Sequence, residues 1–362
     1  MVVILLVEIH ITGQPYYFDR YSSADGLSSV VISDIVQDSS GFIWIGTQDG
    51  LNRFDGHHFK VYKNNPNQET SLNDNLIRSL HIDQNGTLWI GTRKGAARYD
   101  PVFDRFSRLP GLLFGHQNND KVRVYEIVSD KRNHIWIGMQ ENGIFRYNPG
   151  TNQYTHYHAR AEEKNQLNSD FITGLYYDIE TDIVWFTTID GGLQCIILPE
   201  GKVERFESIN SEILANNTVS GIFPVKEKNT DYLWLQSYRN LYKLPRDIQS
   251  AKKAQPCNIF TANYQRSIND VIQTGTNNTW VGGAPLIQYQ PEDKTIHAIK
   301  HSIFEPSSIS DNNITCLFYD SFEVLWAGTE NGLNKLDTRR KAFTFYSQTA
   351  KSNDRLPTGE VQ

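Results

Sequence analysis

The seven tryptophans of this 362-residue chain lie at nearly equal intervals, and this regularity limits the possible folds more than any other feature. Neighbouring tryptophans are 45 to 49 residues apart, and most are followed by a short apolar or small stretch such as Ile45-Gly46-Thr47. A repeat of this length predicts either the blade of a β-propeller or a helical array. The repeated positions are Trp44, Trp89, Trp136, Trp185, Trp234, Trp280 and Trp326.

Short alternating runs within each unit favour strands over helices. β-branched and aromatic residues dominate these runs, and no stretch keeps a 3.6-residue apolar period over the length of a helix. The 18 Tyr and 18 Phe of the chain suit the half-buried surface of a sheet. In the first unit the four runs are 31–36, 42–47, 51–54 and 58–62. We therefore predict an all-β fold, a seven-bladed β-propeller of four-stranded antiparallel blades.

The marker residues of the repeat indicate architecture, because a catalytic group would not be copied into so many units. Asp38 begins the turn before the first Trp and Gly41 ends it, which is the chemistry of a hairpin turn. A metal loop or an acid-base Asp is the functional alternative. The Trp is predicted to fill the wedge between adjacent sheets, and the following Gly marks a close backbone approach. The turn Asp recurs at Asp83, Asp130, Asp178 and Asp320, whereas units five (226–229) and six (274–277) lack it and should have different turns.

A basic residue on the third strand also recurs, and its repetition favours a structural or solvent-facing role over a functional ring of charge. These residues are Arg53, Arg98, Arg146, Lys243 and Lys335.

The charge, the cysteine and histidine content and the absence of common motifs argue against several classes of function. The net charge of −6 argues against direct nucleic-acid contact, which needs a clustered basic surface. Cys195, Cys257 and Cys316 have no motif spacing and are predicted to be free thiols rather than disulfide partners. The ten histidines are scattered, and the common hydrolase motifs do not occur. We predict no catalytic residues, no metal site and no cofactor.

The chain ends raise the question of how the ring closes. Phe18-Asp19-Arg20-Tyr21 has the spacing of a fourth strand but precedes the first unit, so it could join the last blade and remove an open sheet edge. The segment 343–346 competes for the same edge. We predict a tail or signal-peptide remnant at 1–15, the propeller at 16–347, and a linker or the start of a following propeller at 348–362. The chain is accordingly expected to be cut from a longer protein.

The repeats resemble the two-component-regulator propeller repeat. The resemblance rests on Tyr21, followed by Asp25-Gly26-Leu27-Ser28, and then on Asp38, Gly41 and Trp44 at the family's spacing. It extends over residues 16 to 346 and is strongest in units one, two and seven, while units five and six depart from the motif.

This resemblance implies the periplasmic sensor of a hybrid two-component regulator of Bacteroidetes, the extracytoplasmic part of an inner-membrane protein. In that family two propellers precede an immunoglobulin-like domain, a membrane helix, a histidine kinase and a DNA-binding module. It implies an oligosaccharide or other small ligand, control of polysaccharide utilisation, a second propeller as neighbour and a homodimer. Kinase activity would reside outside this chain.

The loops between the second and third strands are the candidate ligand site. They share one face of the ring with the blade-to-blade connections and vary between units, as expected of recognition loops on a repeated scaffold. Solvated loop tips are the alternative for any single residue. The candidates are Gln48, Asp49, Arg93, Lys94, Gln140, Glu141, Asp190, Tyr238, Arg239, Glu330 and Asn331.

Two other functions stay open at this point. One is a propeller-fold polysaccharide lyase or glycoside hydrolase, and the other is a dimerisation scaffold that binds no small ligand.

Overall fold

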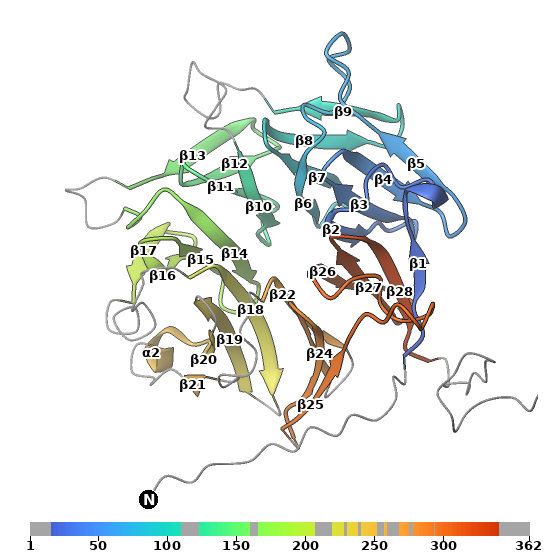
Figure 1. Ribbon diagram of the computed structural model, residues 1–362. Coiled ribbons are helices and arrows are strands. Elements are labelled where there is room, and N and C mark those ends of the chain that lie inside the picture. The colour runs from blue at the N-terminus through green and yellow to red at the C-terminus, as the bar shows by residue number, and fades with distance from the viewer. Residues whose placement is uncertain are drawn as a thin grey trace, which may run out of the picture.

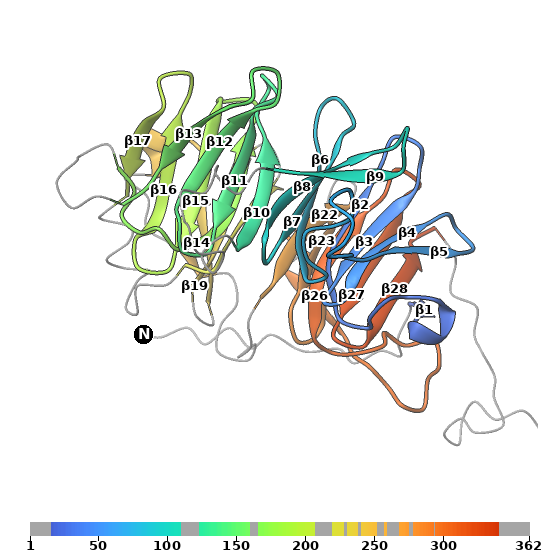
Figure 2. The same ribbon diagram turned by 90° about the horizontal axis from the view of Figure 1, so that it is seen from above.

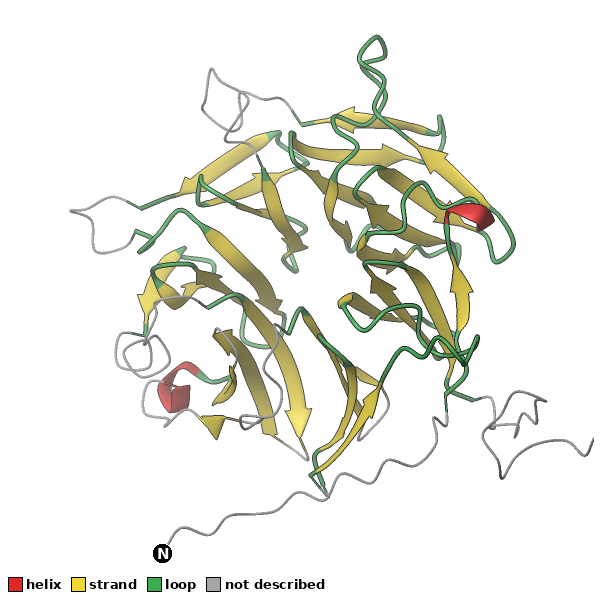
Figure 3. Cartoon of the chain, viewed as in Figure 1, coloured by secondary structure: helices red, strands yellow, loops and turns green. Residues whose placement is uncertain are grey.

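Seven four-stranded sheets stand around a common axis in a computed structural model of the chain (Figure 1). The structure describes residues 16–109, 123–159, 166–206, 219–227, 230–237, 240–251, 257–258, 268–274, 278–292 and 294–339. Each sheet is an antiparallel meander of consecutive strands, apart from the last, and turns connect neighbouring strands (Figure 3). From above, the blades stand next to one another as separate twisted sheets (Figure 2). The predicted seven-bladed β-propeller is confirmed.

The first three blades follow the chain in order. Blade 1 contains β2 (Ile32–Gln37), β3 (Ile43–Thr47), β4 (Gly50–Phe54) and β5 (Phe59–Tyr62). Blade 2 contains β6 (Ile77–Ile82), β7 (Leu88–Thr92), β8 (Gly95–Asp100) and β9 (Arg105–Arg108). Blade 3 contains β10 (Val124–Ser129), β11 (Ile135–Met139), β12 (Ile144–Asn148) and β13 (Gln153–Tyr157).

The next three blades continue in the same way. Blade 4 contains β14 (Ile172–Asp178), β15 (Ile183–Thr188), β16 (Gly192–Ile197) and β17 (Lys202–Arg205). Blade 5 contains β18 (Gly221–Glu227), β19 (Thr230–Ser237), β20 (Asn240–Pro245) and β21 (Cys257–Asn258), with the short helix α2 (Ile248–Ala251) before its last strand. Blade 6 contains β22 (Asp270–Thr274), β23 (Asn278–Gly282), β24 (Leu286–Gln290) and β25 (Thr295–Ile299).

Blade 7 is built from both ends of the described chain. It contains β26 (Ile314–Tyr319), β27 (Val324–Thr329) and β28 (Gly332–Asp337), and its fourth strand is β1 (Asp19–Tyr21). β1 pairs antiparallel with β28, with Asp19 opposite Lys335 and Tyr21 opposite Leu333. A 3-10 turn, η1 (Ser23–Asp25), then leads into blade 1. The N-terminal segment therefore closes the ring, which is one of the two closures that the sequence left open, and the competing segment 343–346 lies outside the described residues.

The tryptophans form the wedges between blades. Trp44 is buried and packs with Leu72 of the connecting segment and with Ile77 and Leu80 of the next blade. Its indole Nε1 donates to Asp38 Oδ2 at 2.7 Å, while Asp38 Oδ1 accepts the backbone N–H of Ser40 and Phe42. The same indole bond joins Trp89 to Asp83, Trp136 to Asp130 and Trp326 to Asp320. The turn Asp thus has the predicted structural role and also orients the wedge Trp.

Blades 4, 5 and 6 depart from this arrangement, and the Trp234 indole of blade 5 has no hydrogen-bond partner within the described residues. Asp178 lies seven positions before Trp185 instead of six, and it forms an ion pair with Arg246 at 3.2 Å. In blade 6 the hydroxyl of Thr274 takes the place of the carboxylate and accepts the Trp280 indole N–H at 3.0 Å. Loss of the Asp therefore changes the contact without removing the wedge.

A glycine follows most of these tryptophans because the next blade comes very close. A Cβ added to Gly46 would lie 2.7 Å from Ile77 Cγ2, well inside van der Waals contact. Gly46 of the second strand lies opposite Asp34 of the inner strand. In this pair the Gly is on the second strand, and the residue with a side chain is on the inner strand. Blades 4 and 5 exchange the two roles, with Gly174 opposite Thr187 and Gly221 opposite Gln236.

Four of the basic residues on the third strands lie over aromatic rings, namely Arg53, Arg146, Lys243 and Lys335. Arg53 lies 4.5 Å from the ring centroid of Phe42 and 5.7 Å from that of Trp44. Arg146 lies 5.3 Å from Trp136, and Lys335 lies 5.7 Å from Trp326. Cations over indole faces stabilise the wedge, which supports the predicted structural role.

Cys195 and Cys316 are buried and form no disulfide, as predicted, and the side chain of Cys257 lies outside the described residues.

Candidate functional site

A cavity of about 790 Å³ lies at the centre of the ring. Its wall is formed mainly by the first strand of each blade, since these strands contact one another around the axis (Figure 1). These inner strands are β2, β6, β10, β14, β18, β22 and β26. The volume falls within the range of about 300–1,000 Å³ that is usual for small-molecule pockets.

β-bulges direct extra side chains toward this cavity. In β2 the pairing passes from Ile32–Thr47 to Asp34–Gly46, so Ser33 is left without a partner in the ladder. Four other inner strands have the same irregularity, and the residues that it leaves out, together with Ser33, all line the cavity. A bulge turns a side chain out of the regular alternation and is frequent beside binding sites. The five bulge residues are Ser33, Arg78, Tyr125, Thr173 and Thr315.

The sequence interpretation missed these residues, although a signal was present. A strand that is buried on one face alternates with period two, but the inner strands have apolar residues three positions apart, as in Ile32 and Ile35 or Ile77 and Leu80. The two polar positions between them contain the bulge. We therefore infer that broken alternation in the first strand was the sequence sign of the bulge in these five units.

Three carboxylates border the cavity and connect neighbouring blades. Asp34 accepts the backbone N–H of Leu80 in blade 2 at 2.6 Å, and Glu126 accepts that of Leu175 in blade 4 at 2.6 Å. Asp270 accepts the N–H of Leu317 in blade 7 at 2.8 Å. The carboxylates thus satisfy backbone donors on the adjacent inner strands.

The surrounding protein raises the pKa of all three groups. Each is partly exposed where it borders the cavity, but protein encloses it on the other sides. Burial raises the pKa of Asp34 to about 7, of Glu126 to about 8 and of Asp270 to about 6, against the lowering effect of the accepted N–H bonds. Burial also raises the pKa of the Cys316 thiol, which makes this cysteine a poor nucleophile.

The loop residues predicted from the sequence divide into two groups. Gln48 and Glu330 line the cavity, so the structure brings these two together on the axis. Asp49 instead pairs with Lys63 at 2.6 Å, and Arg93 and Lys94 lie 3.5 and 3.8 Å from Asp74.

Of the other loop candidates, those that the structure describes are absent from the cavity wall. Gln140 is half-buried, and its backbone N–H donates to the Arg123 carbonyl. Glu141, Asp190 and Asn331 are exposed. Tyr238 and Arg239 lie outside the described residues.

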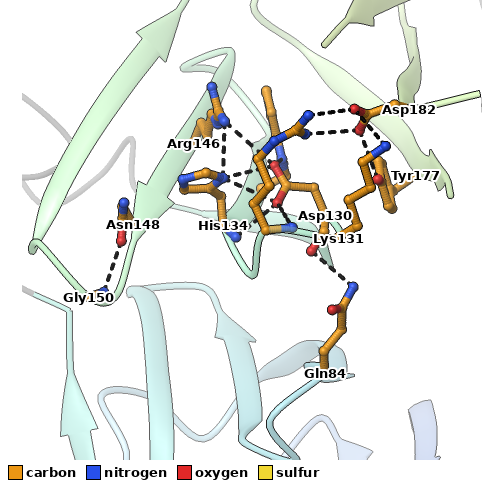
Figure 4. Close-up of polar contacts among 11 residues, drawn as sticks. Gln84, Asp130, Lys131, His134, Arg146, Asn148, Gly150, Tyr177 and Asp182 are labelled. Carbon is orange, nitrogen blue, oxygen red and sulfur yellow. Dashed lines mark hydrogen bonds and ion pairs between the residues drawn. The ribbon is translucent and has the colours of Figure 1, made fainter. Parts of the chain in front are cut away.

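A polar cluster between blades 3 and 4 has a structural role (Figure 4). Asp182 accepts two hydrogen bonds from Arg132, at 3.1 and 2.7 Å, and pairs with Lys131 at 3.0 Å. Burial alone would raise the pKa of Asp182, but these cations and the Tyr177 hydroxyl hold it at about 2. Beside it, Asp130 binds the indole of Trp136. The turn carboxylates are therefore occupied by structural contacts.

The described ranges contain neither a metal-binding cluster nor a helix able to span a membrane. No group of three or more His, Cys, Asp or Glu side chains there is arranged to hold a metal ion. None of the helices found there has the length and apolar character needed to cross a membrane.

Three segments of the chain, residues 26–49, 71–94 and 308–331, match the family model described as the two-component regulator propeller. The matches fall on units one, two and seven, where the motif is strongest, and each contains a strand 2–3 loop. These three units therefore carry the two-component regulator propeller repeat.

A curated relative contains a similar segment. Histidine kinase P4 of Formosa agariphila is 44% identical over 68 residues, which are 19% of this chain and 5% of the relative. The match thus covers a small part of that protein's length.

Solved structures share the propeller fold. The extracellular domain of a hybrid two-component system from B. thetaiotaomicron superposes with a TM-score of 0.72 at 21% identity, over 89% of this chain and 42% of that one. Virginiamycin B lyase from Staphylococcus aureus gives a TM-score of 0.63 at 14% identity, over 89% and 98%. At these identities the similarity establishes the propeller fold and nothing about a ligand.

Proposed function

We propose that this chain is an extracytoplasmic, ligand-sensing propeller of a hybrid two-component regulator that controls polysaccharide utilisation. The observation that carries the proposal is the coincidence of two-component regulator repeats with a propeller of the kind found in the B. thetaiotaomicron extracellular domain. The name of the Formosa agariphila relative, a histidine kinase, supports the same context. In this proposal the periplasm is the compartment, and the kinase lies elsewhere in the full-length protein.

The proposed ligand is an oligosaccharide, bound without turnover. A propeller presents one rigid face with varied side chains, which suits recognition. The turn carboxylates, the most obvious candidates for acid-base chemistry, are engaged by indole and backbone donors. A second propeller and a second copy of the protein are the proposed partners for transmitting the signal.

Calorimetry with a panel of plant, algal and host oligosaccharides, combined with an assay for released products, tests this proposal. We expect saturable binding and no product. Product formation by the purified chain would instead support the lyase or hydrolase alternative. Self-association without binding at millimolar oligosaccharide would support the scaffold alternative.

A further inference from the structure

The bulge positions of the inner strands combine a fixed backbone geometry with varied chemistry. The residue before each of the five bulges is Ile or Val, and the residue two positions after it is Ile or Leu. Between these constant positions the bulge residue changes from Ser to Arg, Tyr or Thr. A position whose backbone is repeated but whose side chain differs between blades meets the requirement for a recognition site on a symmetric scaffold.

We infer that the central cavity is the sugar-binding site of the proposed sensor, and that Arg78 and Tyr125 are its main contact residues. This inference rests on the proposed function and moves the site from the loop tips to the axis. Arg78 and Tyr125 are the longest bulge side chains, and they lie on the inner strands of adjacent blades. They are close enough for the Arg78 charge to influence the Tyr125 phenol.

Loop residues outside the cavity are less suited to this role. Asp49 already pairs with Lys63, and the Asp74 carboxylate, which is 7% exposed, lies near both Arg93 and Lys94. A sugar hydroxyl would have to compete with these ion pairs. Gln48 and Glu330 differ because they line the cavity mouth, and they belong to the inferred site.

The wall of the cavity favours a neutral, hydroxyl-rich sugar. Asp34, Glu126, Asp270 and Glu330 line it, whereas Arg78 is the one cationic side chain among the described lining residues. A uronate or sulfate group would face like charge from the ionised carboxylates, and the ionised fraction of Asp34, Glu126 and Asp270 grows as the pH rises through about 6 to 8. Hydroxyl groups can instead donate to the carboxylates and accept from Arg78.

Aromatic and amide side chains complete the wall. Tyr125, Tyr176 and Phe223 offer apolar ring surfaces, and Asn269 and Gln48 offer amides that can both donate and accept. A few polar groups placed on a partly apolar wall are typical of small-molecule pockets. The same mixture suits a sugar ring, which has hydroxyl groups at its edge and C–H groups on its faces.

The test uses two panels of di- to tetrasaccharides, one neutral and one containing uronate or sulfate groups. Titration calorimetry measures their binding to the wild-type chain and to Arg78→Ala, Tyr125→Phe and Thr315→Trp. Arg78→Ala and Tyr125→Phe remove possible hydrogen bonds, while Thr315→Trp blocks the cavity whichever residue contacts the sugar. The matched controls are Arg98→Ala, on the third strand of the same blade as Arg78, and Thr338→Trp, at an exposed position after β28. Thermal unfolding verifies that every variant is folded.

We expect at least one neutral oligosaccharide to bind. Arg78→Ala should weaken it by about tenfold or more, the loss typical of a hydrogen bond to a charged group. Tyr125→Phe should weaken it severalfold, Thr315→Trp should abolish binding, and both controls should leave it unchanged.

Three results would overturn the inference, and they separate it from the proposed function. Binding that survives both Arg78→Ala and Thr315→Trp would place the sugar outside the cavity while leaving the sensor function intact. Binding of acidic oligosaccharides alone would contradict the neutral class. Failure of both panels to bind would overturn the inference together with the proposed function.

Discussion

Blades 1 and 5 have the same four-stranded meander but share few of the residues that mark the repeat. Blade 1 has the turn Asp38, a Gly opposite Asp34 and a bulge at Ser33. Blade 5 lacks the turn Asp, has Gln236 in place of the Gly, and pairs β18 with β19 without a register shift. Both blades keep the buried Trp, at Trp44 and Trp234.

The features that both blades keep are the ones a blade requires, and the features that blade 5 lacks are dispensable. A large flat side chain is needed to fill the wedge, and one residue of the inner pair must be Gly. Either strand can supply this Gly, since in blade 5 the inner strand supplies Gly221, which lies opposite Gln236. The indole bond is dispensable too, because Trp234 Nε1 has no hydrogen-bond partner within the described part of the chain.

Replacing the wedge Trp should have the largest effect, and the effect should be similar in both blades. Trp44→Ala and Trp234→Ala each remove a fully buried indole, so we expect a loss of about 3–5 kcal/mol in the free energy of unfolding. Urea denaturation measures it, with Phe103→Ala as the control because Phe103 is 66% exposed. A much smaller loss at Trp234 would show that blade 5 is held together differently.

Adding a Cβ to Gly46, which lies opposite Asp34 next to the bulge, should be the next most damaging change. Gly46→Ala places a carbon 2.7 Å from Ile77 Cγ2, and overpacking of this kind costs about 1–3 kcal/mol. Gly150→Ala is the matched control, since the nearest atom to its added Cβ is Asn148 Oδ1 at 3.3 Å, in an exposed turn. Equal stability of the two variants would refute the close-approach explanation.

Removing the turn carboxylate should cost less, because blade 5 folds without one. Asp38→Ala leaves the Trp44 indole and the N–H groups of Ser40 and Phe42 without their acceptor, for a loss of about 1–2 kcal/mol. Asp55→Ala is the control, since Asp55 caps an exposed turn without an indole bond. Thermal unfolding should show a clearly smaller change for the control, and the reverse order would contradict the role assigned to the indole bond.

The cavity carboxylates should give a smaller effect that depends on pH. Their folded-state pKa values of about 7, 8 and 6 lie above the usual values near 4, so the folded protein holds protons that the unfolded chain has released. This contribution to stability is complete below about pH 4 and is lost as the pH rises through 6 to 8.

Thermal unfolding from pH 5 to pH 8 tests this dependence. We expect Tm to fall by a few degrees over this range, and the combined variant Asp34→Asn, Glu126→Gln, Asp270→Asn to flatten the fall. Asp104 and Asp182, with pKa values of about 2, titrate below this window and do not obscure it. A triple variant with the wild-type slope would show that the dependence arises elsewhere.

Much of the fold could be read from the sequence because its determinants are local. The Trp interval, the turn Asp and the strand composition recur within single units of fewer than 50 residues. They predicted seven four-stranded blades, the wedge role of the Trp and the structural role of the turn carboxylate. Even the stray N-terminal strand was recognisable, because Phe18 and Tyr21 repeat the spacing of other fourth strands.

The candidate site was less predictable. Of the expected loop residues that the structure describes, only Gln48 and Glu330 line the cavity, whereas Arg78 and Tyr125 were not expected at all. Whether a side chain faces the axis depends on the register between two strands and on the neighbouring blade, and a one-residue shift changes the face.

The sequence alone therefore determined the repeating unit of this protein, because wedge packing and turn geometry act between residues close together in the chain. The tertiary structure decided how the ring closes at β28 and which side chains surround the axis. The physical reason is that Ser33, Arg78, Tyr125, Thr173 and Thr315 come from blades far apart in the chain and meet only when the ring is complete.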